Sequence, residues 1–497
     1  MRRPASIVWF RSDLRLADNP ALTAAVKRGG PVLPVFVWSP DEEGDWAPGA
    51  ASRWWLHHSL VSLSSAIGKL ASVLVIRQGD TLGQLRQLAR QSGANAVFWN
   101  DRYEPRVALR DRHIKESLRG AGFDAQSFGA GLLHEPGTVL NQAGKPYQVF
   151  TPFWRACLGV TDPPLPLHAP RRLPPPASWP RTLPLDALAL LPAGNWARGL
   201  EAAWKPGEAG ARANLRRFIR TALAGYADGR NRPGQQGTSR LSPHLHFGEI
   251  SPRQVWHTLA TAAREPPPRR SGKKRQPGRS QGTAVAAWRS SQFMTEIGWR
   301  EFAHHLLFHF PHTPREPLRP KFRKFPWRFN ARLMTAWQRG RTGYPLVDAG
   351  MRELWATGWM HNRVRMVAAS FLVKDLLIDW RQGAAWFWDT LVDADLANNT
   401  LGWQWVAGCG ADAAPYYRVF NPVGQGEKFD PDGDYVRRWV PELARLPDNW
   451  LHRPFDAPAA ALKKAGVVLG RDYPAPVVSH AFARQIALMT YAKLGRD

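Results

Sequence analysis

The sequence predicts an α/β domain with a doubly wound parallel sheet, followed by an all-α domain. In the first 130 residues, short β-branched runs alternate with helix-like stretches, as is typical of parallel βαβ units. From about residue 207 helical periodicity dominates and β-branched runs become scarce. A chain of 497 residues is long enough for two or three domains, each with its own core.

The first domain, assigned to residues 1–130, is expected to contain four strands with helices between them. The strands are expected at 6–10, 33–37, 73–76 and 96–99, and the helices at 20–28, 52–70, 81–91 and 107–120. No G-x-G-x-x-G follows a strand, so nothing here favours a dinucleotide. A ligand is still expected beyond the carboxyl ends of the strands, where sheets of this class bind.

Residues 131–206 are assigned to a Pro-rich linker between domains, irregular where proline is dense from 162 to 192. The helical domain is assigned to residues 207–497. Its helices are expected at 211–223, 252–263, 287–307, 345–357, 362–379 and 480–493. The basic stretch 264–283 interrupts this domain and is expected to be a mobile surface loop.

The charge of the chain favours a polyanionic partner. Lys and Arg number 67 against 40 Asp and Glu, which gives a formal net charge of +27. Such a field attracts nucleic acid by steering and by counterion release, with an acidic membrane surface as the second candidate. A basic surface that serves only solubility, or a basic tail, is the alternative without a partner.

Cysteine content and hydropathy indicate the compartment. The two cysteines, Cys157 and Cys409, lie far apart, which excludes a disulfide framework and a zinc site built from them. No secretory leader is evident, and no apolar run reaches the roughly 18 residues of a membrane span. We expect a protein of the cytoplasm, located with the DNA. Nothing indicates an oligomer, so a monomer is expected.

The chain is rich in tryptophan, with 24 indoles, more than half of them beyond residue 280. Most are expected to pack in cores, where Trp is usually found. Indoles can also stack on bases or flavin rings, or relay electrons.

Four clusters in the expected helical domain carry a resemblance to a known family. They are 225–226 with 237–242, 293–300, 359–366 and 393–405, and the stretch 8–15 near the N-terminus adds to them. Through these motifs the chain resembles the DNA photolyase and cryptochrome family. It is most similar to cyclobutane pyrimidine dimer photolyases of class I and class III, which are related to plant cryptochromes. The resemblance implies FAD as cofactor and DNA containing pyrimidine dimers as substrate.

The first cluster has small hydroxyl residues at an expected helix start, where free backbone N–H groups and the helix dipole can hold phosphate. An ordinary Ser or Thr cap is the alternative. The resemblance implies that Tyr226 packs beside the flavin. The residues implied to grip its diphosphate are Thr238, Ser239, Arg240, Leu241 and Ser242.

The second cluster places Glu296 and Arg300 four residues apart on one helix face, so a salt bridge between them is one interpretation. The resemblance implies instead that Glu296 hydrogen-bonds the damaged bases, Trp299 stacks on them, and Phe293, Glu296 and Arg300 contact the cofactor. A carboxyl group among indoles tends to keep its proton. A protonated Glu296 suits donation to a carbonyl that gains negative charge.

The third cluster contains Trp359, Asn362, Arg363, Arg365 and Met366. By resemblance Trp359 and Asn362 contact the flavin, Asn362 also contacts the lesion, Arg363 touches DNA phosphate, and Arg365 pairs with an acid near the flavin. Relatives that repair (6-4) photoproducts tend to have histidine where this chain has Asn362 and Met366, which favours the cyclobutane lesion. The neighbouring His361 is interpreted as structural.

In the fourth cluster Asp393 is implied to pair with Arg365, Asp395 to hold the flavin and Asn399 to face its reactive nitrogen. Plant cryptochromes usually carry Asp at the last position. Because an amide cannot protonate the flavin, Asn399 favours the reduced anion as the resting form. Trp405 is implied to flank the lesion opposite Trp299.

Two further sets of residues follow from the resemblance. Trp403, Trp380 and Trp327 match the electron relay of the family, from the flavin outward, although each alone is more typical of a core. Trp386 and Trp388 are a branch of this relay or core residues. The positions that match DNA contacts, besides Arg363, Trp299, Asn362 and Trp405, are Arg230, Arg418 and Gln425.

The function expected is light-driven repair of cyclobutane pyrimidine dimers, by electron transfer from excited reduced FAD to a flipped lesion and back, without a metal. The α/β domain is expected to hold an antenna chromophore, methenyltetrahydrofolate or alternatively a deazaflavin, because 38–40 and 48–55 resemble photolyases close to plant cryptochromes. The alternatives are a (6-4) photolyase and a cryptochrome-type photoreceptor, which often carries a long C-terminal extension that this chain lacks. A third alternative is a colourless, basic DNA-binding protein with a Trp-rich core.

Overall fold

The structure is a computed structural model that describes residues 3–264, 288–413 and 417–495. The expected mobile loop at 264–283 lies, from residue 265 onward, outside the described residues. The chain forms two compact units, which interleave along the sequence. The sheet unit comprises Met1–Ala193, Lys205–Thr221 and Ser239–His309, and the helical unit comprises Gly194–Trp204, Ala222–Thr238 and Phe310–Asp497.

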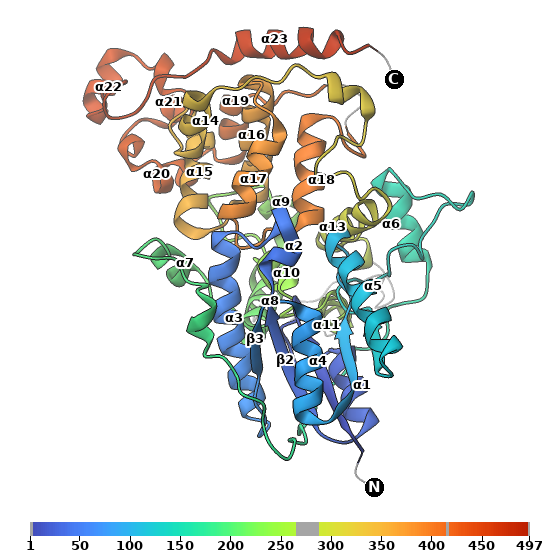
Figure 1. Cartoon of the computed structure of the whole chain (residues 1–497). Coiled ribbons are helices and arrows are strands. Elements are labelled where there is room, and N and C mark those ends of the chain that lie inside the picture. The colour runs from blue at the N-terminus through green and yellow to red at the C-terminus, as the bar shows by residue number, and fades with distance from the viewer. Residues whose placement is uncertain (1–2, 265–287, 414–416, 496–497) are drawn as a thin grey trace, which may run out of the picture. The chain divides into compact units, whose positions relative to one another are not determined.

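The sheet unit is built on a five-stranded, all-parallel sheet in the order β3-β2-β1-β4-β5 (Figure 1). The strands are β1 (Ala5–Phe10), β2 (Val32–Trp38), β3 (Val75–Gln78), β4 (Ala94–Asn100) and β5 (Asp124–Phe128). The helices between them are α1 (Pro20–Arg28), α2 (Pro40–Glu43), α3 (Ala50–Gly68), α4 (Thr81–Ser92) and α5 (Pro105–Gly120). This confirms the doubly wound parallel sheet.

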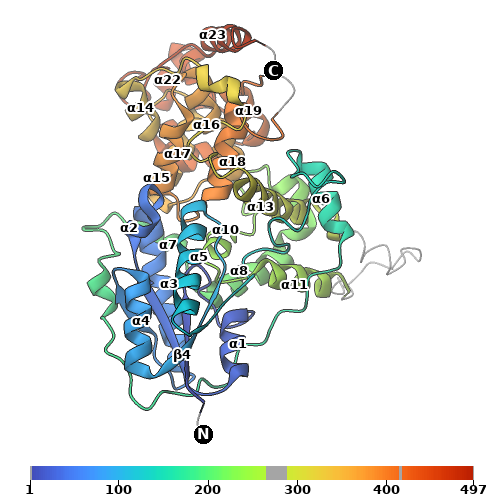
Figure 2. The ribbon, with the colours of Figure 1, turned by 45° about the vertical axis from the view of Figure 1, so that its right-hand side comes forward.

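Helices cover both faces of the sheet, and Figure 2 shows α1 and α4 on opposite sides of the strands. On one face Trp9 and Trp99 pack with Leu85 and Leu88 of α4 and Ile114 of α5 in one buried cluster. Strand β1 is buried along its whole length, as expected for a central parallel strand.

The sequence predicted four of the five strands. It missed β5, which reads Asp-Ala-Gln-Ser-Phe and has no β-branched residue. This strand is at the edge of the sheet and only partly buried, so it needs no apolar run. Helix α1 coincides with its predicted bounds, because Asn19 caps it by accepting the N–H of Leu22 at 3.0 Å and proline follows at its first position.

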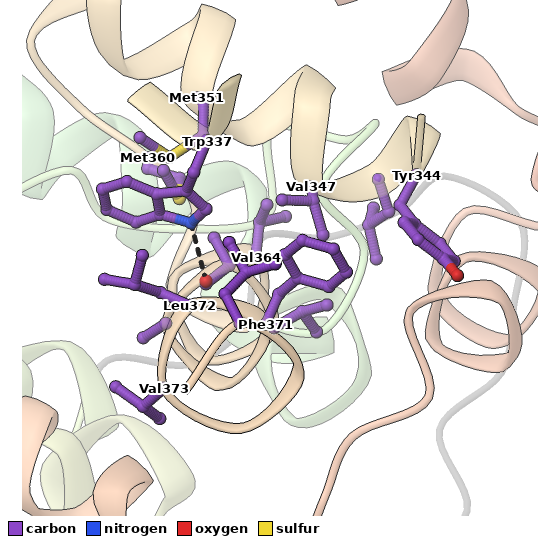
Figure 3. Packing of buried hydrophobic residues seen from close by; sticks show 14 of the residues in the cluster. Trp337, Tyr344, Val347, Met351, Met360, Val364, Phe371, Leu372 and Val373 are labelled. Atoms are coloured by element: carbon purple, nitrogen blue, oxygen red, sulfur yellow. Dashed lines mark hydrogen bonds between the residues drawn. The ribbon is translucent and has the colours of Figure 1, made fainter. Parts of the chain in front are cut away.

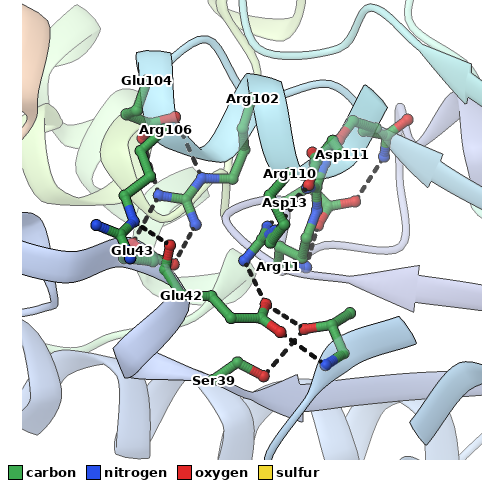
Figure 4. A network of polar contacts seen from close by, with 12 residues as sticks. Arg11, Asp13, Ser39, Glu42, Glu43, Arg102, Glu104, Arg106, Arg110 and Asp111 are labelled. Atoms are coloured by element: carbon green, nitrogen blue, oxygen red, sulfur yellow. Dashed lines mark hydrogen bonds and ion pairs between the residues drawn. The ribbon is translucent and has the colours of Figure 1, made fainter. Parts of the chain in front are cut away.

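Strand β1 lies between β2 and β4. The chain adds β2 and β3 on one side of β1 and then β4 and β5 on its other side, so the direction in which strands are added changes at β1. In sheets of this class, ligands bind beyond the carboxyl ends of the strands at such a point. A network of ion pairs occupies this edge (Figure 4). Arg102 lies 2.7 Å from Glu43 and 2.9 Å from Glu104, Arg110 lies 3.1 Å from Glu42, and Arg11 pairs with Asp111.

The sheet unit also contains helices that follow the five strands in the sequence. They are α6 (Phe150–Gly159), α8 (Glu208–Thr221), α10 (Ser242–His246), α11 (Pro252–Arg264) and α13 (Gln292–His309). The Pro-dense stretch from 162 to 192 is irregular apart from one 3-10 turn, Leu185–Leu188.

The helical unit is formed by helices around one large apolar core. Its helices are α7 (Arg198–Ala203), α9 (Tyr226–Gly229), α14 (Ala331–Gln338), α15 (Pro345–Thr357), α16 (Asn362–Ser370), α17 (Trp380–Thr390), α18 (Leu396–Ala407), α19 (Pro422–Phe429), α20 (Asp434–Trp439), α21 (Asp448–Leu451), α22 (Ala459–Ala465) and α23 (His480–Ala492). In the core, shown in Figure 3, Trp337 donates its indole N–H to the carbonyl of Ala368 at 2.9 Å.

The prediction of one continuous helix over 362–379 is wrong. Helix α16 ends at Ser370 and passes into one π-type turn, Phe371–Asp375. Leu377 then adopts a left-handed backbone with φ of 53°, and the N–H of Ile378 bonds back to the carbonyl of Leu372. The apolar periodicity continues through this break, so the break could not be predicted from the pattern of residues.

Among the described residues, the structure contains no helix with the length and apolar character needed to cross a bilayer.

Candidate functional site

Helix α13 carries the second sequence cluster. Phe293 is buried and packs against Phe218 with ring centroids 4.5 Å apart. Glu296 accepts a hydrogen bond from the side-chain amide of Gln292 at 2.9 Å, one turn earlier on the same helix. Glu296 and Trp299 are both half-buried, so they stand at the margin of the unit's core.

Arg300 and Glu301 tie this helix to the turn after β5. The guanidinium of Arg300 donates to the carbonyl of Gly131 at 2.7 Å. Glu301 is buried and accepts the backbone N–H groups of Leu133 and His134 at 2.9 and 3.1 Å. Burial raises the pKa of the Glu301 carboxyl to about 7, against the opposing effect of Arg300.

The first sequence cluster belongs partly to each unit: residues 225–238 are in the helical unit and residues 239–242 are in the sheet unit. In the helical unit, Tyr226 is buried at the start of α9, and the segment folds back so closely that a Cβ at Gly237 would lie 2.4 Å from the carbonyl oxygen of Gly229. Only glycine permits this approach, which brings the segments ending in Arg230 and Thr238 together.

In the sheet unit, residues 239–242 form a turn before the short helix α10. The hydroxyl of Ser239 accepts the N–H of Leu241 at 3.3 Å, and Arg240 has a left-handed backbone with φ of 53°. Leu241 is buried, and Ser242 is the first residue of α10.

Helix α16 begins directly after His361, which caps it, and its first residues include Asn362, Arg363 and Arg365 of the third cluster. His361 is 2% exposed, and its Nδ1 accepts the backbone N–H of Arg363 at 3.2 Å. Burial, with nearby Arg363 and Arg365, lowers the His361 pKa to about 3, so the ring is a neutral acceptor. This agrees with its interpretation as a structural residue. Asn362, next along the chain, is exposed.

Arg363 extends from α16 toward the segment after α9. Its guanidinium donates to the side-chain oxygen of Asn231 at 2.6 Å and lies 4.5 Å from the ring centroid of Phe429. It also lies 4.0 Å from the sulfur of Met366. The position of Arg363 is therefore fixed by several contacts.

Arg365 and Asp393 form the ion pair that the sequence resemblance implies. One guanidinium nitrogen lies 3.0 and 2.8 Å from the two oxygens of Asp393, and Nε donates to the carbonyl of Met360 at 2.7 Å. The guanidinium also lies 5.9 Å from the ring centroid of buried Trp359.

Helix α18 begins with the polar residues of the fourth cluster. Asp395 caps it by accepting the backbone N–H of Asn398 at 2.9 Å and the side-chain amide of Asn398 at 2.7 Å. Asn399 donates a side-chain N–H to the carbonyl of Ala384 at 3.1 Å, which fixes the plane of its amide.

The three indoles assigned to an electron relay differ in burial. Trp380 is 1% exposed and Trp403 is 2% exposed, whereas Trp327 is half-buried beside Phe325, with ring centroids 4.2 Å apart. The ring centroid of Trp403 lies 6.2 Å from that of Trp337 and 5.0 Å from that of Phe387. It lies so close to α17 that a Cβ at Gly383 would be 2.1 Å from its ring.

Other indoles form a second cluster in the helical unit. Trp386 stacks on Trp355 with centroids 5.9 Å apart and planes 4° apart, and Trp196 meets Trp355 edge-on at the same distance. Trp355 is 51% exposed. Trp388, the other branch candidate, is packed against the core.

The remaining positions matched to DNA contacts lie at or near the surface of the helical unit. Arg418 is exposed, and Arg230 and Gln425 are partly buried. Trp405 and Arg418 line one pocket with two further cationic residues, Arg319 and Lys374. The indole N–H of Trp405 donates to the carbonyl of Asp412 at 3.0 Å.

Sequence reasoning missed several residues that fix the candidate site. Phe150 stacks on Trp299, Asn231 binds Arg363, and Gly383 lies against Trp403. Phe150 was assigned to a linker because proline is frequent after it, although the run from Val149 to Trp154 is rich in aromatic residues and could have indicated a packed helix.

Two family models match the chain. Residues 6–171 match the family model described as DNA photolyase, and residues 293–493 match the FAD binding domain of DNA photolyase. The chain is 50% identical to the deoxyribodipyrimidine photo-lyase of Agrobacterium fabrum, over 98% of this chain and 97% of that protein.

Two other relatives show the range of the similarity. Cryptochrome-1 of Arabidopsis thaliana is 42% identical over 95% of this chain and 68% of that protein. The crystal structure of a class III photolyase from Agrobacterium tumefaciens superimposes with a TM-score of 0.92 and 49% identity, covering 99% of this chain and 98% of that one.

Proposed function

The chain belongs to the DNA photolyase and cryptochrome family, and from this premise we propose that it is a deoxyribodipyrimidine photo-lyase, which repairs cyclobutane pyrimidine dimers in DNA with light. The observation that carries the proposal is 50% identity to a photo-lyase along almost the whole of both chains. Similarity to a plant cryptochrome is lower, at 42%. We retain residues 1–130 as the antenna domain and 207–497 as the domain that binds FAD and DNA.

The residues of the helical unit fit a flavin. Arg365 and Asp393 form a polar pair whose carboxylate is only 4% exposed, and Asp395 and Asn399 lie in the first turn of α18. A flavin ring needs such donors and acceptors at its edge, and its diphosphate needs hydroxyl and backbone N–H groups. We assign Trp359, Asn362, Arg365, Asp393, Asp395 and Asn399 to the ring side, and Tyr226 and Thr238 to the diphosphate side.

We also assign Ser239, Arg240, Leu241 and Ser242 to the flavin diphosphate, and Phe293, Glu296 and Arg300 to the cofactor. When bound and reduced, FAD would supply the chemistry of light-driven, reversible electron transfer to the dimer. The cycle has no net redox change, so the residues of the chain need only bind, orient and stabilise charge.

Asn399 keeps an amide beside the flavin instead of a carboxyl. The hydrogen bond to Ala384 holds that amide in one orientation. Because the amide carries no acidic proton, it favours the reduced anion.

Glu296 and Trp299 act on the lesion. We assign the carboxyl proton of Glu296 to a dimer carbonyl, which gains negative charge when the electron arrives. Gln292 holds the carboxyl of Glu296 in place from one turn before. By the resemblance, Trp299 and Trp405 each offer an indole on which an extruded dimer packs.

Asn362 and Met366 favour the cyclobutane lesion over the (6-4) photoproduct. Both positions lie on α16, one turn apart, and neither carries an imidazole that could act as an acid or base.

Positive side chains fix the DNA through its phosphates. We assign Arg230, Arg363 and Arg418, with Gln425, to backbone contacts, because phosphate contacts position a duplex while the pocket recognises the base. The contacts of Arg363 with Asn231 and Phe429 fix the orientation of its guanidinium before DNA binds. We propose that the protein acts on DNA as a monomer.

We propose an antenna on the sheet unit, methenyltetrahydrofolate or alternatively a deazaflavin. The carboxyl edge of the strands, where β1 separates β2 from β4, is the place that the topology favours. Release of the chromophore by denaturation, followed by its absorption and fluorescence spectra, identifies it. A spectrum with flavin alone contradicts the antenna.

The test of the function is repair of an oligonucleotide with one thymine dimer, in blue light and in the dark, beside the same oligonucleotide with a (6-4) product. We expect repair of the thymine dimer in light only, and none of the (6-4) product. Binding of damaged DNA without repair in light favours a photoreceptor. A colourless purified protein contradicts both flavoprotein functions.

A further inference from the structure

One face of the Trp299 indole is covered by Phe150. The two ring centroids are 3.9 Å apart and the planes are 9° from parallel, which is a full stack. Phe302 contacts Trp299 edge-on, with centroids 5.9 Å apart and planes at 73°. Phe150 is 7% exposed and Phe302 is fully buried. Of the two faces of Trp299, only the one opposite Phe150 can therefore receive another ring.

The covering ring cannot shift easily, because α6 and α13 are in close contact. A Cβ at Gly298 would lie 2.5 Å from the ring of Trp154, so the glycine lets α6 lie directly on α13. Phe153 adds contacts to Phe302 and His305, with centroids 5.2 and 4.8 Å apart. Phe150 is thus held on a rigid support.

We infer that Phe150 is a positioning residue for damage recognition: it locks the Trp299 indole in the orientation that an extruded pyrimidine dimer meets. The inference rests on the proposed function. Without Phe150 the Trp299 indole would gain rotamer freedom. Binding of the dimer would then have to restrict the indole again, at a cost in conformational entropy. A pre-stacked indole avoids that cost, as rigid supports of binding sites generally do.

The chain offers a matched control in Phe153, which follows Phe150 by one turn on α6. Phe153 is as deeply buried, at 2% exposure, and its aromatic contacts are with Tyr147, Phe302 and His305. A general loosening of α6 from α13 would follow from loss of either ring. Loss of the stack on Trp299 follows only from loss of Phe150.

The experiment is a double-mutant cycle on the full-length flavoprotein. The single variants are Phe150→Leu, Phe150→Tyr, Phe153→Leu and Trp299→Ala, and the double variant combines Phe150→Leu with Trp299→Ala. The dissociation constants for a thymine-dimer oligonucleotide and for its undamaged form are measured in the dark. Flavin content and thermal midpoint are recorded for each variant.

We expect Phe150→Leu to weaken binding of the dimer by about threefold to tenfold, with binding of undamaged DNA unchanged. Phe150→Tyr keeps the stack and should stay within about twofold of the parent. Phe153→Leu should lower the thermal midpoint and leave the preference for damage unchanged. In the Trp299→Ala background, Phe150→Leu should have no further effect on that preference.

Two results would overturn the inference: an equal loss of damage preference from Phe150→Leu in both backgrounds, or the same loss from Phe153→Leu. If Phe150→Leu does not fold, Phe150→Met provides the same comparison with a flexible side chain of similar volume. The preference of the parent protein for dimer DNA shows whether the inference about Phe150 or the proposed function itself has failed. A parent with no preference for the dimer refutes the proposed function, whereas a clear preference without coupling refutes only the role of Phe150.

Discussion

Arg365 holds both carboxylate oxygens of Asp393 with one guanidinium nitrogen, at 3.0 and 2.8 Å. The Asp393 side chain is 4% exposed and that of Arg365 is 23% exposed, so the pair is mostly shielded from water. Removal of one partner from such a pair leaves a charge with poor solvation, which costs more than the pair itself contributes.

We therefore expect Asp393→Asn to lower the free energy of unfolding by about 1–3 kcal/mol and to reduce the flavin retained on purification. Urea denaturation and the ratio of flavin to protein absorbance measure the two effects. Asp472→Asn is the control, because Arg471 and Asp472 form an exposed pair that water screens, so its loss should change the free energy of unfolding much less. Equal effects of the two substitutions would argue against a special role for Asp393.

Trp403→Phe should block photoreduction of oxidised flavin, while enzyme reduced beforehand still repairs dimers. In the function proposed above, the relay only restores the reduced flavin and takes no part in the repair cycle. Absorption spectra during illumination follow the first property, and a single-turnover repair assay follows the second.

Trp337→Phe is the matched control, since Trp337 is fully buried and contacts Trp403 at 6.2 Å without belonging to the relay. It should cost stability, through the lost hydrogen bond to Ala368, and leave photoreduction intact. Loss of repair by pre-reduced Trp403→Phe would contradict the separation of relay and repair.

Glu296→Ala should lower the quantum yield of repair by about twofold to tenfold and change the affinity for dimer DNA less, because the lost hydrogen bond strengthens only after the electron arrives. Glu296→Gln keeps an N–H donor, so its quantum yield of repair should lie between those of the parent and of Glu296→Ala. Repair per absorbed photon on saturated enzyme is the measurement. An unchanged yield in Glu296→Ala would remove Glu296 from the reaction.

Glu301 gives the protein a pH-dependent stability. Burial raises its pKa in the folded protein to about 7, from an ordinary value of 4.5. Between these two values the folded state binds the proton and the unfolded state does not, so stability falls as pH rises from 4.5 to 7. The loss is on the order of 3 kcal/mol, at about 1.4 kcal/mol for each pH unit between the two pKa values.

Glu301→Gln should remove this decline in the free energy of unfolding, because the amide does not titrate and can still accept the N–H groups of Leu133 and His134. Glu427→Gln, at a half-exposed position, should keep the decline of the parent. Denaturation curves at pH 5, 6 and 7 compare the three proteins. A decline that persists in Glu301→Gln would assign it to another group.

The sequence predicted those parts of the fold that depend on local pattern. Four strands and helices such as α1 and α15 follow from apolar periodicity and caps, which neighbouring residues alone specify. Strand β5 and the break after Ser370 depend on tertiary contacts instead: an edge position for β5, and the hydrogen bond of Ile378 to Leu372 for the break.

The same distinction holds for the candidate site. The ion pair of Arg365 and Asp393 could be anticipated, because both residues belong to family motifs. The stack of Phe150 on Trp299 joins residues 149 positions apart in the chain, and nothing local to either one indicates the other. Contacts of this kind become visible only when α6 is seen lying on α13.

The three indoles of the proposed relay differ in burial, and this difference has a consequence for the direction of electron flow. An indole that has lost an electron is a cation, and a cation is least stable where water is excluded. Trp403 and Trp380 are sealed in the core, whereas Trp327 reaches the surface. In the proposed relay, solvation would therefore favour the positive charge at Trp327 over the two buried indoles, and a charge held there would return more slowly.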